Sequence, residues 1–315
     1  MVRNINPYLV DAKDALLEKR RKPLCLVPEI GIGNKPIDGG HYLFTTPEKM
    51  AFLSLEPSAA PYFRPWLGGE EFLNGGERWC LWLGDCPPDK LRAMPYARQR
   101  AEAVRLYRLG KGPNKKGKIP EEAPPASTQD LAQTPTRFHV ENMPAGNFIV
   151  IPEASSERRQ FIPMSFMSPD TICSNLVKIA PNATLYHLGI LLSSMHMAWV
   201  RQVCGRLESR YRYSVGIVYN NFPWPRAIKD KQKAAIEVAA QTVLDARAKF
   251  PNASLADLYD PVTMPSELAR AHQSLNKIVD RAYGRVFISD AERVAFLFDL
   301  YAEYTSLSAT RKGKS

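Results

Sequence analysis

The segment that most constrains the fold is residues 205–225, which read GRLESRYRYSVGIVYNNFPWP. Its last four residues alternate aromatic rings with prolines, and proline neither donates a hydrogen bond to a sheet nor fits the interior of a helix. Any strand in this segment must therefore end before Phe222. Residues two apart in a strand lie on the same face, so a strand here would place Glu208 and Arg210 side by side.

The spacing of Glu208 and Arg210 has two interpretations. The first is an exposed ion pair, which stabilises a protein by less than about 1 kcal/mol. The second is a pair of base readers, because a carboxylate accepts a hydrogen bond from cytosine N4 and a guanidinium donates two to guanine O6 and N7. The residue types alone leave both interpretations open; under the second, the chemistry favours a G·C pair.

The sequence pattern changes after Pro225. Downstream, apolar residues recur at helical spacing around residues 236–244, 268–282 and 294–301, and Ser289 and Glu292 form a capping box before the third segment. We therefore expect a small helical bundle over residues 227–308 and a frayed basic tail at 309–315. Residues 23–226 instead show short strand patterns interrupted by prolines, so the expected fold class is α+β, with a mixed strand-rich domain before the bundle.

Within the first 226 residues, the pattern predicts several particular elements. They are a short strand over residues 2–10, a charged helix over 12–22, strands over 148–152, 161–166 and 170–179, the last containing Asn175, and one long buried helix over 187–207.

A basic region lies between residues 90 and 126. Ala97, Ala101 and Val104 form the apolar stripe of a helix predicted over residues 96–109, and we place its arginines mostly on the opposite face. A basic, proline-rich loop follows over residues 110–126. The region is either a solvated helix and linker or a contact surface for DNA phosphates. The phosphate candidates here are Arg105, Arg108, Lys115 and Lys116.

Composition narrows the class of protein. The formal net charge is +10 and the isoelectric point is about 9.3, which suits a polyanionic partner. The sequence has no run of apolar residues long enough to cross a membrane and no evident signal peptide, so we expect a cytoplasmic protein. Its five cysteines show no C-x-x-C spacing, which argues against a disulfide framework or a zinc knuckle.

Several longer motifs are distributed along almost all of the chain. They are NINPYLVDA, GNKPIDGGHY, RPWLGGEEF, RWCLWL, PEASSERRQFIP, PNATLYHLGIL, MHMAWVRQVCGRLESRYRYS, IVYNNFPWP and SLADLYDP with the helical sequence after it. With these motifs the chain resembles the C-terminal part of MmeI-like type IIL restriction–modification enzymes, which methylate adenine N6 and cleave DNA at a distance.

The resemblance covers the target-recognition and C-terminal helical domains of that family. It implies that residues 1–22 are the exit segment from a methyltransferase core, that residues 23–226 are the recognition domain, and that residues 227–308 are the helical domain. We find no candidate nuclease cluster, S-adenosylmethionine loop or N-P-P-[YF] loop in the sequence. We therefore expect a fragment or split subunit that is catalytically silent alone. S-adenosylmethionine and Mg are expected only for the missing catalytic parts.

The resemblance also implies site residues. It assigns base reading to Glu208 with Arg210 and to Glu153 with Asn175. Further phosphate candidates are Arg158, Arg159, Arg206 and Arg212. The expected partners are double-stranded DNA and a methyltransferase core on the same or a separate chain. The alternative is a protein–protein interaction module whose helical bundle docks a partner without specific DNA binding.

Overall fold

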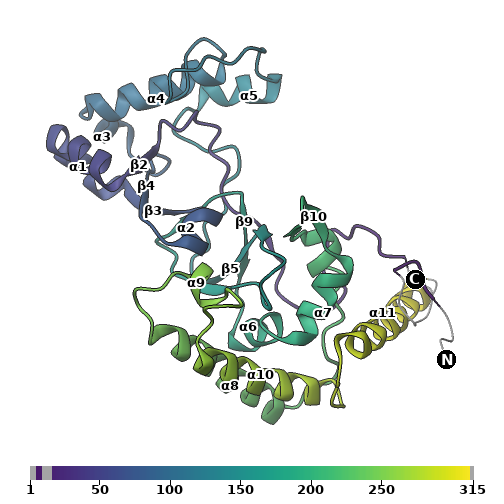
Figure 1. Ribbon diagram of the computed structural model, residues 1–315. Coiled ribbons are helices and arrows are strands. Elements are labelled where there is room, and N and C mark those ends of the chain that lie inside the picture. Colours follow the sequence, from purple (N-terminus) through teal and green to yellow (C-terminus); the bar gives the residue numbers. More distant parts are fainter. Residues whose placement is uncertain (1–4, 9–15, 313–315) are drawn as a thin grey trace. The chain divides into compact units, whose positions relative to one another are not determined.

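A computed structural model describes residues 5–8 and 16–312, with backbone only over 307–312, and shows an α+β protein (Figure 1). The chain forms two compact units. We call Met1–Gly31, Gly146–Met167 and Lys178–Ser315 the β5 unit, and Ile32–Ala145 with Ser168–Val177 the β3 unit. The β5 unit joins the helices after Pro225 to strands that precede it, so the compact units do not follow the predicted boundary at residue 226.

The β3 unit is built on a four-stranded sheet of order β2-β4-β3-β8. β4 pairs antiparallel with β2 and β3, and β3 pairs parallel with β8. Phe44, Phe52 and Phe63 pack edge to face in its core. The elements are β2 (Leu43–Thr45), α1 (Thr46–Leu55), η1 (Pro57–Tyr62), β3 (Phe63–Leu67), α2 (Gly69–Asn74), β4 (Arg78–Leu81), α3 (Pro88–Arg92), α4 (Pro95–Arg108), α5 (Ala126–Asp130), η2 (Leu131–Gln133) and β8 (Ile172–Cys173).

The β5 unit contains the strands β5, β7 and β9 of a sheet of order β1-β9-β5-β7 and a second sheet of order β10-β11-β6. α8 and α10 run side by side, and α6 packs against α8 (Figure 1). The elements are β1 (Gly31–Ile32, at the boundary between the units), β5 (Phe148–Pro152), β6 (Ala154–Ser155), β7 (Ser165–Met167), β9 (Val177–Pro181), α6 (Leu185–Leu191), α7 (Ser194–Val203), β10 (Gly205–Leu207), β11 (Arg210–Arg212), η3 (Val215–Tyr219), α8 (Asp230–Ala248), α9 (Leu255–Leu258), α10 (Ser266–Ala282) and α11 (Asp290–Lys312).

Several predicted elements are present in the structure, and others are interrupted by a cap or a turn. The strand at 148–152 and the three C-terminal helices are present. The long helix predicted at 187–207 is wrong, because the Ser193 side chain caps a new helix by accepting a hydrogen bond from the His196 N–H. The predicted strand at 170–179 is interrupted by a turn at Asn175 and Leu176. Of the two predicted N-terminal elements, residues 2–4 and 9–15 lie outside the described residues, and residues 16–22 are not helical.

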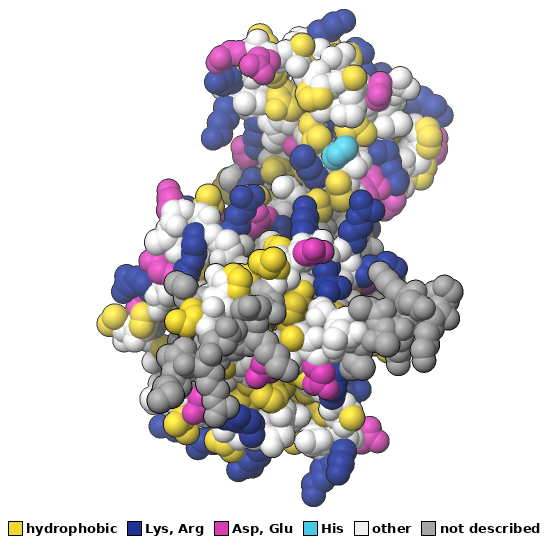
Figure 2. Space-filling model, turned by 90° about the vertical axis from the view of Figure 1, so that its right-hand side faces the viewer, with side chains coloured by type: hydrophobic (Ala, Val, Ile, Leu, Met, Phe, Trp, Pro, Cys, Tyr) yellow, Lys and Arg dark blue, Asp and Glu magenta, His cyan; other side chains and the backbone are white. Residues whose placement is uncertain are grey.

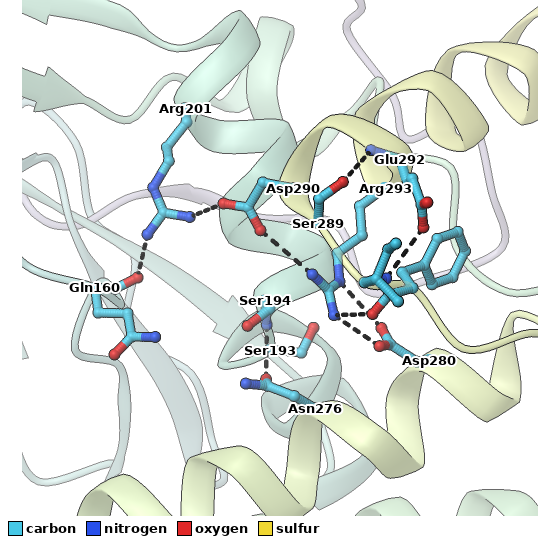
Figure 3. A network of polar contacts seen from close by, with 12 residues as sticks. Gln160, Ser193, Ser194, Arg201, Asn276, Asp280, Ser289, Asp290, Glu292 and Arg293 are labelled. Carbon is cyan, nitrogen blue, oxygen red and sulfur yellow. Dashed lines mark hydrogen bonds and ion pairs between the residues drawn. The ribbon is translucent and has the colours of Figure 1, made fainter.

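The C-terminal helices are fixed to α7 by a polar network (Figure 3). Arg201 on α7 pairs with Asp290 at the start of α11, at 2.6 Å, and donates to the Gln160 carbonyl oxygen. Arg293, one turn further along α11, pairs with Asp280 on α10 at 2.7 Å, and both of these side chains are largely buried. Because buried ion pairs demand accurate geometry, the Arg293–Asp280 pair fixes α11 against α10, while the partly exposed Arg201–Asp290 pair links α11 to α7.

The aromatic–proline sequence at 222–225 lies in the core of the β5 unit. Phe222 and Trp224 are buried, so neither ring is available to stack on a base. The hydroxyl of Tyr283, which directly follows α10, donates to the Pro223 carbonyl oxygen, and the Tyr304 hydroxyl on α11 donates to that of Trp224. Hydrogen bonds therefore join this segment to the helical region that follows it.

Candidate nucleic-acid interface

The opening segment folds into a two-stranded ribbon, β10 and β11, which pair antiparallel with Leu207 opposite Arg210. Glu208 and Ser209 form the two-residue turn between them. A continuous strand through Glu208, the case considered from the spacing, is therefore not present, because the chain reverses there. The predicted proximity is nevertheless present: Arg210 Nη2 lies 2.9 Å from Glu208 Oε2. The Glu208 side chain is 78% exposed and that of Arg210 47% exposed, so the pair lies at the solvent-facing tip of the ribbon.

Glu208 has a backbone conformation that most residues avoid. Its φ is +57°, in the left-handed region, and it occupies the first turn position of a two-residue hairpin. Hairpins with a positive φ only at this position favour glycine there. A non-glycine residue in this region costs on the order of 1 kcal/mol. Ile37, Asn182 and Ala227 also have a positive φ, so the strain at Glu208 is consistent with a functional role but does not establish one.

Replacing Glu208 with glycine is expected to raise the free energy of unfolding by a few tenths to about 1 kcal/mol, because glycine adopts this φ without a steric penalty. Chemical denaturation of the full chain measures the change. Ser209→Gly is the matched control, since Ser209 is also exposed but does not have a positive φ. A glycine at 208 that destabilises the protein as much as one at 209 would show that Glu208 is not strained.

The base of the ribbon is anchored in the core of the β5 unit. Tyr211 and Tyr213 are buried, and the Tyr213 hydroxyl donates to His196 Nε2 over 3.0 Å. This assignment follows because His196 Nδ1 must donate to the Leu191 carbonyl oxygen, which can only accept. Burial lowers the pKa of His196 to about 4, so its ring stays neutral near pH 7 and keeps this arrangement. The exposed tip therefore extends from a rigid base.

Glu153 directly follows β5 and lies beside the base of the ribbon. Its backbone oxygen accepts a hydrogen bond from the Tyr213 N–H over 2.7 Å. Its carboxylate is bonded to two cations: Oε2 to the ammonium of Lys178 and Oε1 to Arg212 Nε at 3.2 Å. Burial raises the pKa of Glu153, but the two cations outweigh it and lower the pKa overall, so the carboxylate is ionised. Glu153 is thus held more firmly than Glu208.

Asn175, the predicted partner of Glu153, is half-buried in the turn between β8 and β9. It belongs to the β3 unit, whereas Glu153 belongs to the β5 unit. Within the β5 unit, the Glu153 carboxylate is bonded to Lys178 and Arg212.

The phosphate candidates differ in their surroundings. Arg206 stacks over the Tyr211 ring at 4.1 Å, Arg158 lies 3.9 Å from Asp260, and Arg159 donates to Ser155 Oγ over 3.4 Å. In the β3 unit, Arg105 pairs with Glu102, Lys115 pairs with Glu48, and Lys116 is exposed in its loop. Lys and Arg side chains are prominent on the face shown in Figure 2.

Arg108 is not available to DNA. It is fully buried, and its guanidinium donates to five backbone carbonyl oxygens at 2.7–3.1 Å. A guanidinium has five N–H groups, so its donor capacity is used completely. The prediction that Arg108 contacts phosphate is therefore wrong. The acceptors are the carbonyl groups of Pro36, Ile37, Leu131, Thr134 and Arg137.

Comparison with known proteins identifies the family. A family model described as the MmeI target recognition domain matches residues 11–226, and another, described as the MmeI C-terminal domain, matches residues 228–308. This chain belongs to the MmeI family. The predicted resemblance is confirmed, and the division between the two matched regions falls at the aromatic–proline segment.

The chain matches only part of two longer relatives. DNA methyltransferase A from Bacillus subtilis (strain 168) is 41% identical over 306 residues, which are 97% of this chain and 33% of that protein. A solved structure of the type IIL restriction–modification enzyme MmeI in complex with DNA is 45% identical, with a TM-score of 0.89, and the match covers 97% of this chain and 39% of that chain. The chain therefore spans between a third and two-fifths of the length of these relatives.

Sequence reasoning missed Lys178, the buried cation that is paired with Glu153. It lies within the apolar run Val177-Lys178-Ile179-Ala180, which forms most of β9. A single lysine inside a buried strand is costly unless its ammonium has a partner, so the pattern itself predicts a buried carboxylate nearby. The identity of that carboxylate, Glu153, follows from the tertiary structure, because the two residues are 25 positions apart in sequence.

Proposed function

We propose that this chain recognises a DNA sequence on behalf of an adenine-N6 DNA methyltransferase and restriction enzyme of the type IIL class. The observation that carries the proposal is the exposed Glu208–Arg210 pair at the tip of a rigidly anchored ribbon, in a chain of the MmeI target-recognition family. The major groove of B-DNA admits a two-stranded β-ribbon, and its base edges are read by side chains of these two types.

The energetics of the exposed pair support this role. A solvent-exposed ion pair is worth less than about 1 kcal/mol, whereas a good base contact in the groove is worth about 1–3 kcal/mol of discrimination. Glu208 and Arg210 can therefore give up their mutual contact in exchange for contacts to a base pair. We assign them a G·C pair, with Arg210 donating to guanine and Glu208 accepting from cytosine N4.

Phosphate contacts would supply most of the affinity. Lys116, Arg158 and Arg206 are exposed cations, and the formal net charge of the chain is +10. Neutralising phosphates releases counterions, so binding should weaken steeply as salt rises. These contacts fix the register of the protein on the duplex without reading its sequence.

Methyl transfer and cleavage belong, in this proposal, to other parts of the enzyme, on the same or a separate chain. S-adenosylmethionine and Mg are assigned to those parts. Within residues 5–8 and 16–312 no cluster of three His, Cys, Asp or Glu side chains could hold a metal ion. None of the described helices combines the length and apolar content that a membrane crossing requires. The proposed role places the chain in the cytoplasm with DNA.

Selection from a library of randomised duplexes tests the proposal, with the full chain as bait. We expect one sequence to be enriched, and its affinity to fall as salt is raised. Lys116→Met should weaken binding to every duplex alike and reduce the slope of log affinity against log salt by about 1. Weak, salt-insensitive retention with no enriched sequence would contradict the proposal and favour the protein-docking role of the helices after residue 226.

A further inference from the structure

Lys178 occupies an unusual place for a cation. It lies on β9, next to β5 in the four-stranded sheet, and its side chain is only 7% exposed. At that burial the ammonium cannot reach a DNA phosphate. Its partner is the carboxylate of Glu153, which is 23% exposed. A buried ammonium is tolerated when it is paired in this way, so the position of Lys178 constrains the position of Glu153.

Glu153 in turn joins the two sheets of the β5 unit. It separates β5 from β6, and β6 pairs with β11 of the ribbon. Its backbone oxygen accepts from the Tyr213 N–H, and its carboxylate accepts from Arg212, the last residue of β11. These two contacts are made by the last residue of β11, the strand that begins with Arg210, and by the residue that directly follows it.

We propose that Lys178 is a positioning residue for sequence recognition: from within the sheet it orients the Glu153 carboxylate, and through Glu153 and Arg212 it sets the position of the β10–β11 ribbon against the base edges. This inference rests on the proposed function. Lys178 contacts no DNA itself; it acts through Glu153. The net lowering of the Glu153 pKa agrees with this arrangement, because the carboxylate stays charged and keeps both cations bound.

The experiment uses the full chain, the duplex enriched from the randomised library, and duplexes that carry every single base-pair substitution of it. Lys178→Met keeps the length and the apolar stem of the side chain but removes the ammonium. We expect this variant to keep its affinity for unrelated duplexes and its salt dependence, because no phosphate contact is lost. We expect it to lose about tenfold or more of its preference at the base pairs read by the ribbon or by Glu153.

A double-mutant cycle separates positioning from general loosening. Glu153→Gln should lose preference at the same base pairs, and the Lys178→Met/Glu153→Gln protein should lose no more than the worse single variant, because both changes break one interaction. Lys178→Gln keeps a donor for Glu153 and is expected to recover part of the preference. If Lys178→Met does not fold, the comparison of Lys178→Gln with Glu153→Gln carries the same test.

The outcomes are distinguishable from a failure of the proposed function. If the wild-type protein enriches no sequence, both the proposed function and the role of Lys178 are overturned. Wild-type protein that enriches a sequence, with Lys178→Met folded and equally selective at every base pair, would overturn the role of Lys178 alone. Equal weakening of all duplexes by Lys178→Met would also overturn it, since that is the behaviour expected of Lys116→Met.

Discussion

Replacing Arg108 with methionine is expected to lower the free energy of unfolding by on the order of 3–5 kcal/mol. Methionine fills much of the space but leaves five carbonyl oxygens without their donor. Each buried acceptor that loses its partner costs about 1–3 kcal/mol, and water molecules that enter the site offset part of this cost. These carbonyl groups belong to the segments at residues 36–37 and 131–137, so the β3 unit should lose its packing around the end of α4.

Peptide-resolved hydrogen exchange, together with chemical denaturation, measures this effect, with the loss of protection expected in residues 32–145. Arg105→Met is the matched control, because Arg105 lies on the same helix but pairs with Glu102 in solvent and should change stability by less than about 1 kcal/mol. An Arg108→Met protein that unfolds like the wild type but binds all duplexes more weakly would restore Arg108 as a phosphate contact.

Replacing Arg210 with alanine is expected to weaken binding to the enriched duplex by about 1–3 kcal/mol and to relax the preference at one base pair. The loss arises because alanine donates nothing to a guanine, while the ribbon itself remains: Arg210 is half exposed, and its neighbour Tyr211 keeps the ribbon packed on the core. Stability should change little, since the Glu208–Arg210 pair is exposed.

Repeating the duplex selection with the variant measures the change in preference. Glu208→Ala should relax the same base pair as Arg210→Ala, because the two side chains are 2.9 Å apart and would share one pair. Lys116→Met is the control, because it should weaken binding to every duplex alike without changing the preference at any base pair. If Arg210→Ala enriches the unaltered sequence with undiminished preference, Arg210 is not a base reader and the ion pair is only a surface contact.

Arg108 and Arg210 were both predicted from the sequence to contact DNA, one at a phosphate and the other at a base. In α4, Ala97, Ala101 and Val104 are buried, and Arg108 continues their spacing of four, three and four residues. The stripe therefore contained a signal that Arg108 faces inward. The charge of the residue favours the opposite interpretation, and only the five convergent carbonyl groups, from segments up to 72 residues away, make its burial tolerable.

In the ribbon, too, the sequence predicted part of the arrangement and the tertiary structure decided the rest. The spacing of Glu208 and Arg210 predicted that they lie together, which is correct, but a strand was the wrong reason. A turn of two residues also brings them together, and in this turn Glu208 has a positive φ. No residue pattern in GRLESRYRY predicts that conformation. Local sequence does not distinguish the two cases, because the choice depends on β11 pairing with β6, more than 50 residues earlier.

What the sequence by itself determined is the family, the α+β class, the helical character after Pro225 and the end of the ribbon before the aromatic–proline segment. Each of these depends on local patterns: motif identity, helical periodicity and the restrictions of proline. The tertiary structure alone decided which charges are exposed and which are buried. Arg108, Lys178 and Glu153 acquire their roles from partners distant in sequence, because the cost of burying a charge is set by what surrounds it after folding.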